Sequence, residues 1–410
     1  MKYGCIGEHL KHSFSKEIHN AFADYDYEIC EIPRCELGAF FDVSDFSAIN
    51  VTIPYKEEVI PYLYYIDDFA KSIGAVNTIV NRDGKLYGYN TDFYGMTSLI
   101  HHAGVSLKGK KVAILGTGGT SKTAYAVAKA EGASSIIKVS RSGKDSAVTY
   151  EELYEKHKDT EIIINTTPSG MFPNIFDKAV DISAFPNLSG VIDAVYNPLR
   201  TTLISDARNA GIPSEGGLYM LVAQAVRASE IFLDKEYPYG TLDRVFEKIY
   251  REKENIILVG MPASGKSTVG KILSEKLGRE MIDTDDMIIE KAGMPITEIF
   301  GRMGEKYFRD LETECVKEAS AKSSVIIATG GGVPLRAENV GALRLNGKIF
   351  FLDRPLEMLI PTASRPLSSD RESLEKRYNE RYGIYTECCD VKVDASQDAI
   401  LVAEKIIEEI

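Results

Sequence analysis

This 410-residue chain has few cysteines, fewer basic than acidic residues and no long apolar run. Its six cysteines form no C-x-x-C pair, which argues against a zinc site or a disulfide scaffold and favours reduced thiols. Lys and Arg number 48 against 60 Asp and Glu, and this net charge of -12 argues against nucleic acid as the main partner. No apolar run reaches the roughly 18 residues that a membrane span requires.

The start of the chain also lacks the apolar region of a signal peptide, because Met1 to Ile6 run straight into a strand pattern. The hydrophobic share of 44% and the charged share of 26% are typical of a soluble globular protein. We therefore expect a cytoplasmic protein with no membrane partner, and an oligomer stays possible.

Short apolar, β-branched runs alternate with amphipathic stretches along the whole chain, which predicts α/β domains with parallel sheets. A helix is expected over about Leu218–Leu233, and another around Val269–Leu277. The expected strands include Lys111–Leu115, Ile136–Val139, Ile162–Ile164, Ile256–Val259, Val325–Ala328 and Ile349–Leu352.

The length allows two to three domains. A charged segment over 246–255 lies between two complete strand–helix systems and predicts a linker. We expect a first lobe over 1–106, rejoined by a helix at about 218–245, a second lobe over 107–245, and a last domain over 256–410.

A glycine-rich turn follows the strand at Lys111–Leu115 and precedes a helical stretch. Gly116, Gly118 and Gly119 would let backbone N–H groups approach a pyrophosphate at the start of that helix. Because Ser121 replaces the third glycine of G-x-G-x-x-G, the turn alone is a weak signal, and a purely structural turn stays open.

The strand that follows strengthens the cofactor prediction. It ends in Ser140, Arg141 and Ser142, where an NAD-binding site would usually carry an acidic residue for the ribose hydroxyl. An arginine there can hold the 2′-phosphate of NADP(H) by charge-assisted hydrogen bonds. The sequence therefore predicts a Rossmann-type lobe that binds NADP(H).

A second phosphate-binding loop begins after the strand at Ile256–Val259. Residues 260–268 match G-x-x-x-x-G-K-[ST], whose amides cradle the phosphates of ATP. Lys266 would neutralise phosphate charge, and Ser267 would ligate Mg²⁺. The nucleotide-binding residues of this loop are Gly260, Gly265, Lys266, Ser267 and Thr268.

Residues 1–240 resemble the shikimate dehydrogenase family through nine ordered motifs. These are Tyr3–Gly7, Lys11–Ser15, Ile18–Asn20, Asn50–Lys56, Gly74–Thr78, Gly88–Asp92, Asn165–Met171, Asp193–Pro198 and Gly217–Gln224. The resemblance implies that Lys56 and Asp92 flank the carbonyl being reduced, where a lysine can supply a proton and a carboxylate can tune its pKa. It further implies substrate contacts from Ser13, Ser15, Thr52, Asn77, Tyr196 and Gln224, and cofactor contacts from Thr166 and Gly217.

Residues 254–410 resemble shikimate kinases. The carrying motifs are 282–288 with its paired aspartates, 299–300, 304–305, 308–309, 328–332, 365–367 and Arg381 before Tyr385. The resemblance implies that Asp283 supports Mg²⁺, that Asp285 hydrogen-bonds the attacking hydroxyl, and that Arg365 closes over the transferring phosphate. Substrate contacts are implied for Arg309 and Arg381, whose guanidinium forks suit a carboxylate, and for Gly331 and Gly332.

The resemblances together imply a bifunctional shikimate-pathway enzyme that uses NADP(H), ATP and Mg²⁺. Two alternatives stay open at this point. The first half could instead act on quinate as well as shikimate, or use NAD. One half could also be a degenerate binding module, although Lys56, Asp92, Lys266, Asp285 and Arg365 are all present.

Overall fold

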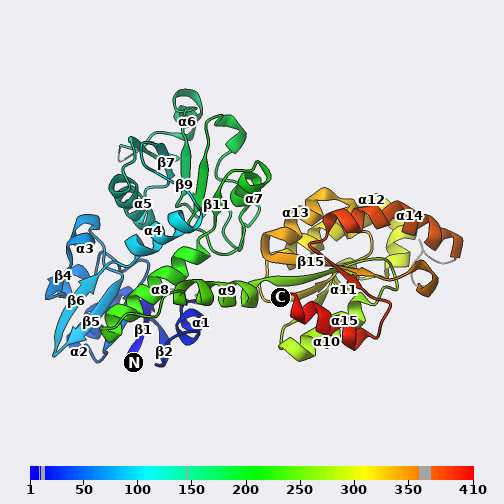
Figure 1. Cartoon of the computed structure of the whole chain (residues 1–410), viewed down its shortest axis with the longest axis horizontal. Coiled ribbons are helices and arrows are strands. Elements are labelled where there is room, and N and C mark those ends of the chain that lie inside the picture. The colour runs from blue at the N-terminus through cyan, green and yellow to red at the C-terminus, as the bar shows by residue number, and fades with distance from the viewer. Residues whose placement is uncertain (9, 11–13, 145, 360–370) are drawn as a thin grey trace. The chain divides into compact units, whose positions relative to one another are not determined.

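The computed structural model describes residues 1–410 except 9, 11–13, 145 and 360–370. Its described residues divide into two compact units, Met1–Tyr250 and Arg251–Ile410 (Figure 1). Both units are α/β, which confirms the predicted fold class.

The first lobe of the first unit is built on a six-stranded mixed sheet with the strand order β2-β1-β3-β5-β6-β4. Successive residues of a strand face opposite sides, so Ile49 joins the apolar cluster under α2 while Ala48 joins the cluster that contains Phe232 of α8. The elements are β1 (Tyr3–Gly7), α1 (Ser15–Asn20), β2 (Tyr27–Glu31), α2 (Leu37–Val43), β3 (Ala48–Val51), β4 (Tyr65–Ile66), α3 (Asp68–Ile73), β5 (Thr78–Arg82), β6 (Lys85–Tyr89) and α4 (Asp92–His102).

The second lobe carries a five-stranded parallel sheet with the order β11-β10-β9-β7-β8. Ile114 belongs to the apolar cluster that includes Val127 of α5, and Ala113 to the one that includes Ile204 of α7. Helices therefore cover both faces, which explains why these strands read as continuous apolar runs. The elements are β7 (Lys111–Leu115), α5 (Gly119–Ala130), β8 (Ser135–Val139), α6 (Tyr150–Lys156), β9 (Ile162–Asn165), β10 (Gly190–Asp193), α7 (Thr202–Asn209) and β11 (Ser214–Glu215). Two helices follow this lobe in the chain, α8 (Leu218–Leu233) and α9 (Thr241–Lys253).

The helix expected over about Leu218–Leu233 is α8, but the segment expected to extend it to about 245 contains the start of a separate helix, α9. Helix α8 ends at Leu233, because Asp234 takes a left-handed conformation with φ of 51°. Helix α8 contacts α1, α4, β3 and β5, so it packs on the first lobe (Figure 1). The expected linker at 246–255 falls on the end of α9 and the start of β12, and the division between the units lies inside it.

The second unit has a five-stranded parallel sheet with the order β13-β14-β12-β15-β16. Ile257 clusters with Leu343 of α13, whereas Leu258 clusters with Leu273 of α10, so helices cover both faces here too. The elements are β12 (Asn255–Val259), α10 (Lys266–Leu277), β13 (Met281–Asp283), α11 (Thr284–Ala292), α12 (Ile296–Ser320), β14 (Ile326–Ala328), α13 (Ala337–Asn346), β15 (Gly347–Asp353), α14 (Arg371–Cys388), β16 (Val391–Asp394) and α15 (Ala399–Glu408).

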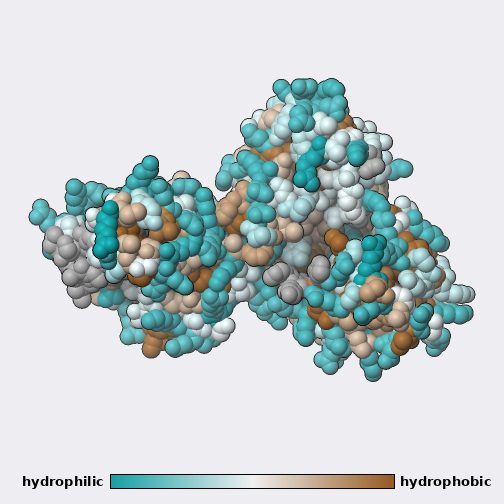
Figure 2. Space-filling model, turned by 180° about the vertical axis from the view of Figure 1, so that it is seen from behind, coloured by the Kyte–Doolittle hydropathy of each residue, from teal (hydrophilic) through white to brown (hydrophobic). Residues whose placement is uncertain are grey.

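The surface seen in Figure 2 is mostly hydrophilic, with small and scattered hydrophobic areas. Among the described residues, no helix has the length and apolar character needed to cross a membrane.

Candidate functional site

A lysine–carboxylate pair lies where β3 and β6 of the first lobe end and the antiparallel β5 begins. Lys56 follows β3, and Asp92 is the first residue of α4. The Lys56 Nζ donates to Asp92 Oδ2 at 2.6 Å, with the two side chains only 22% and 14% exposed. The sequence prediction placed these two residues at one site, and the structure brings them together.

Three more polar groups lie beside this pair. Asn77 and Thr91 are buried, and Asn77 Oδ1 accepts the Thr91 backbone N–H at 2.8 Å. The Thr91 hydroxyl donates in turn to Gln224 Oε1 at 3.4 Å. Thr91 therefore joins two predicted substrate contacts that are far apart in the sequence.

The other predicted substrate contacts come from three segments, two in this lobe and one in the second lobe. Thr52 directly follows β3, and its backbone N–H donates to the Ile6 carbonyl at 3.0 Å. Ser15 begins α1, and the neighbouring Phe14 ring meets the Tyr196 ring edge-on at 5.3 Å. Burial raises the pKa of Tyr196. Ser13 lies outside the described residues.

Six of the eight predicted dinucleotide-binding residues line a cavity of about 850 Å³ in the second lobe. Its lining includes Gly116 and Gly118 after β7, the Ser140–Ser142 turn after β8, and Thr166 after β9. These residues follow β7, β8 and β9, and β8 lies on one side of β7 whereas β9 lies on the other. The strand order therefore reverses at β7, and open α/β sheets bind ligands at such a point. Gly119 and Gly217 are not among the lining residues.

Two local features explain the conformation of the glycine-rich turn that follows β7. Gly116 has a φ of 109°, and a Cβ there would lie 2.8 Å from Thr166 Oγ1, so a larger residue would be both strained and crowded. The Ser121 hydroxyl donates to the Gly116 carbonyl at 2.7 Å, so the residue that replaces the third glycine secures the turn. Gly217 serves packing, since a Cβ there would lie 2.2 Å from the Ala194 carbonyl oxygen.

The phosphate-binding loop of the second unit joins β12 to α10. Three of its residues have positive φ, namely Gly260, Ala263 and Gly265. Lys266 is 5% exposed, and its Nζ donates to the Gly260 and Met261 carbonyls at 2.9 and 3.0 Å. Thr268 is exposed on the first turn of α10.

Ser267 and Asp283 lie side by side at this loop, where the hydroxyl of Ser267 donates to Asp283 Oδ2 at 2.7 Å. Oxygen ligands of this kind, together with substrate phosphates, are the usual protein environment of Mg²⁺. The two residues therefore fit the predicted metal, although the described residues contain no group of three or more His, Cys, Asp or Glu that could hold an ion.

Two arginines meet the glycine turn after β14. Arg309 is 9% exposed and crowds Gly332, where an added Cβ would lie 2.0 Å from its Nη1. Arg381 is 8% exposed and donates to the Gly331 carbonyl at 3.0 Å. The residues that were predicted to bind shikimate therefore lie together at this turn.

A buried glutamate, which the sequence reasoning missed, completes this cluster. Glu312 is 1% exposed and accepts from Arg309 Nη1 with both carboxylate oxygens, at 2.9 and 2.8 Å. Burial raises the pKa of Glu312, and Arg309 opposes that shift. Asp285 lies next to it, since a Cβ on Gly330 would be 2.5 Å from Asp285 Oδ1 and 3.3 Å from Glu312 Oε1. Arg365 lies outside the described residues.

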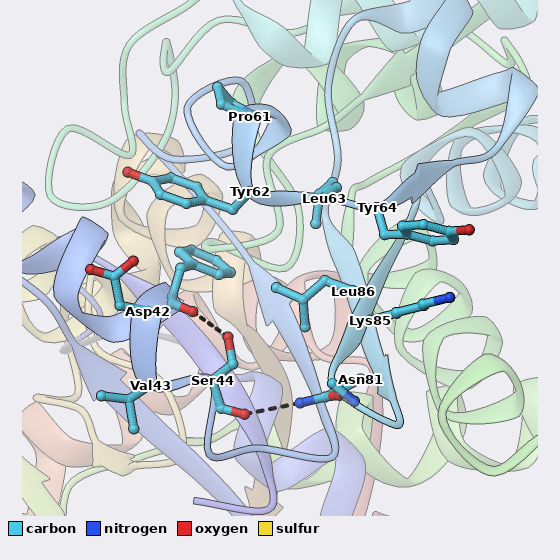
Figure 3. Close-up of a pocket in the computed structure, with 12 residues that line it drawn as sticks. Asp42, Val43, Ser44, Pro61, Tyr62, Leu63, Tyr64, Asn81, Lys85 and Leu86 are labelled. Carbon is cyan, nitrogen blue, oxygen red and sulfur yellow. Dashed lines mark hydrogen bonds between the residues drawn. The ribbon is translucent and has the colours of Figure 1, made fainter.

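Sequence reasoning also missed one wall of the dinucleotide cavity, formed by Thr167–Ser169, Tyr150 and residues 171–174 and 177–179. A second hollow, of about 570 Å³, contains none of the predicted site residues. It lies between the end of α2 and the turn from β5 to β6, where Asn81 Nδ2 donates to the Ser44 carbonyl at 2.9 Å (Figure 3).

Comparison with known proteins confirms both resemblances. The family model of the shikimate dehydrogenase substrate binding domain matches residues 5–79, and that of shikimate kinase matches residues 262–410. The "Shikimate dehydrogenase (NADP(+))" of Clostridium beijerinckii is 38% identical over 270 residues, which are 61% of this chain and 99% of that protein. The one from Halothermothrix orenii is 39% identical over 258 residues, or 56% of this chain and 89% of that protein.

Solved structures agree over the first unit. Shikimate dehydrogenase 1 from Peptoclostridium difficile is similar with a TM-score of 0.55 at 36% identity, covering 61% of this chain and 98% of its own. A chorismate mutase/shikimate 5-dehydrogenase fusion protein from Clostridium acetobutylicum gives 0.57 at 32% identity, with coverage of 61% and 97%. The chain therefore belongs to the shikimate dehydrogenase family and carries a shikimate kinase domain C-terminal to its dehydrogenase part.

Proposed function

We propose that this enzyme catalyses two consecutive reactions: the NADPH-dependent reduction of 3-dehydroshikimate to shikimate, and the ATP-dependent phosphorylation of shikimate to shikimate 3-phosphate. The observation that carries the first reaction is the Lys56–Asp92 pair at 2.6 Å. The phosphate-binding loop beside the Ser267–Asp283 contact supports the second.

In the first unit, bound NADPH supplies a hydride, and the protein must then protonate the oxygen of the reduced carbonyl. Lys56 is the proton donor in our proposal, and Asp92 holds its ammonium group in place. Asn77 and Gln224, joined through Thr91, orient the ring hydroxyls. Ser13, Ser15 and Tyr196 bind the carboxylate, and Thr52 adds a hydroxyl contact.

Cofactor choice in this unit depends on Arg141, which lines the dinucleotide cavity. We expect Arg141→Ala to raise KM for NADPH by about 30-fold with little change for NADH, a loss of about 2 kcal/mol for hydrogen bonds to a charged phosphate. Steady-state kinetics with both cofactors measure this. Arg208→Ala, an exposed arginine paired with Glu215 in the same lobe, is the matched control. Equal effects of Arg141→Ala on both cofactors would show that the arginine does not read the 2′-phosphate.

In the second unit, the loop amides and Lys266 bind the ATP phosphates, and Ser267 and Asp283 hold Mg²⁺, which neutralises phosphate charge when bound. Asp285 accepts the proton of the attacking hydroxyl, and Arg309 and Arg381 bind the shikimate carboxylate. Gly331 and Gly332 allow the ring to approach the backbone. Arg365 would stabilise the transferring phosphoryl group.

The carboxylate-binding role predicts a specific result for Arg309→Lys. The lysine keeps the charge but loses the planar fork, so KM for shikimate should rise by about tenfold or more while KM for ATP stays the same. Arg302→Lys, on the other side of the kink at Gly304 and with a side chain 69% exposed, is the control. An equal rise in both KM values would count against a carboxylate contact.

One purified preparation can test both reactions and the alternatives. We expect NADPH to be preferred over NADH, shikimate over quinate in the dehydrogenase assay, and shikimate over quinate, gluconate and adenylate as phosphoryl acceptor. If the wild-type chain lacked one of the two activities, this result would favour the alternative in which one half is a degenerate binding module. If gluconate or adenylate were phosphorylated faster than shikimate, the acceptor assignment would be wrong.

We further propose a cytoplasmic location, in keeping with reduced thiols.

A further inference from the structure

The carboxylate of Asp193 joins three segments of the second lobe, and neither reaction described above uses it. Asp193 is the last residue of β10, is completely buried and pairs in register with Asn165 of β9. Its Oδ1 accepts from Asn165 Nδ2 at 2.9 Å and from the Val195 N–H at 3.0 Å, and its Oδ2 accepts from the Thr201 hydroxyl at 2.7 Å. All three partners are donors, which suits an ionised carboxylate. Burial raises the pKa of Asp193 to about 7 against these hydrogen bonds, so the carboxylate prevails above neutral pH.

The first segment is the wall of the dinucleotide cavity. Because an ionised carboxylate only accepts, Asp193 requires the amide nitrogen of Asn165 on its side and turns the amide oxygen the other way. That oxygen accepts from the Thr167 backbone N–H at 3.0 Å and from its hydroxyl at 2.7 Å. Thr167 and Ser169 line the cavity, and the Ser169 N–H donates to Thr167 Oγ1 at 3.3 Å. Asp193 therefore fixes the conformation of this wall through Asn165.

The second segment is the turn that carries Tyr196. The bond from the Val195 N–H to Asp193 fixes this turn at its start. The Val195 carbonyl accepts from the Gly217 N–H at 2.8 Å, just before α8 begins. The third segment is the start of α7, where Thr201 donates to Asp193 and accepts from the Ile204 N–H at 3.3 Å.

We propose that Asp193 is a positioning residue for hydride transfer, because it holds the cofactor wall at Thr167 and the substrate-side turn at Tyr196 in one fixed arrangement. The inference rests on the proposed dehydrogenase function of this unit. Asp193 touches neither ligand, and its effect passes through Asn165 and Val195.

The test uses the full-length enzyme above neutral pH. Asp193→Asn keeps the size but replaces one carboxylate oxygen with an NH₂ group and removes the charge, so the hydrogen bonds that hold Asn165 and Val195 are weakened. We expect about a tenfold rise in KM for NADPH with a lower kcat, the scale of one hydrogen bond to a charged group. Thr201→Val should act in the same direction, whereas Thr201→Ser keeps the hydroxyl and should restore wild-type values. Asp159→Asn, an exposed residue paired with Lys111, is the control.

Two further readouts separate positioning from mere stability. The deuterium isotope effect with 4-deuterated NADPH should increase in Asp193→Asn, since misplacement slows the hydride step itself, and kinase turnover of the same preparation should not change. Wild-type KM and kcat in a folded Asp193→Asn protein would overturn the proposal, as would a Thr201→Ser variant as impaired as Thr201→Val. If even the wild type failed to reduce 3-dehydroshikimate, the proposed function would fall instead. Titration with NADP⁺ would then decide, since unchanged affinity in Asp193→Asn would refute the positioning role.

Discussion

Lys56→Ala is expected to abolish the reduction of 3-dehydroshikimate while kinase turnover on the same preparation stays nearly intact. Lys56 is the positioned proton donor in our proposal, and loss of such a group typically costs about 10²- to 10⁴-fold in rate. The substitution also leaves the Asp92 carboxylate, only 14% exposed, without its partner at 2.6 Å. NADPH oxidation and ATP-dependent phosphorylation of shikimate, measured on one sample, provide both rates.

Two controls make this result specific. Lys71→Ala removes an exposed lysine of the same lobe, paired with Asp68 at 3.4 Å, and should leave both activities unchanged. A melting curve for Lys56→Ala shows whether the first unit is still folded. If a folded Lys56→Ala protein lost kinase activity to the same degree, the two-site model would be wrong.

The sequence alone was sufficient for the parts of this enzyme that depend on local pattern. Strand residues 112–115 and 162–164 are buried on both faces, so each of these stretches reads as an unbroken apolar run. The position of the loop between β12 and α10 was equally predictable, because its glycines, its lysine and its serine stand at fixed spacing between a strand and a helix.

Contacts between distant segments could not be read in the same way. Thr91 lies 133 positions before Gln224, and only the packing of α8 on the first lobe brings them together. Glu312 stands three residues after Arg309, so helical spacing was a usable signal, but burial of the pair depends on the fold. The expected helix end at Leu233 agrees with the structure, but the extension of this helix to about 245 was wrong, because Asp234 takes a left-handed conformation and α9 is a separate helix.

Asp285→Asn is the matching test of the kinase. In our proposal this carboxylate accepts the proton of the hydroxyl that attacks ATP, so kcat should fall by about 10²- to 10⁴-fold even at saturating substrate. KM for ATP should change little, because Lys266 and the loop amides bind the phosphates. Lys266→Ala should instead impair nucleotide binding whichever acceptor is offered. The measurement is steady-state phosphorylation of shikimate with each substrate varied in turn.

The adjacent residue offers a control that differs only in position. Asp286 is exposed on the first turn of α11, whereas Asp285 is half-buried and points toward Gly330, where an added Cβ would lie 2.5 Å from its Oδ1. Asp286→Asn removes the same charge from the same helix and should keep wild-type kcat. If both variants lost kcat equally, the effect would come from the charge at the start of α11. If Asp285→Asn raised only KM for shikimate, Asp285 would bind the acceptor without serving as the base.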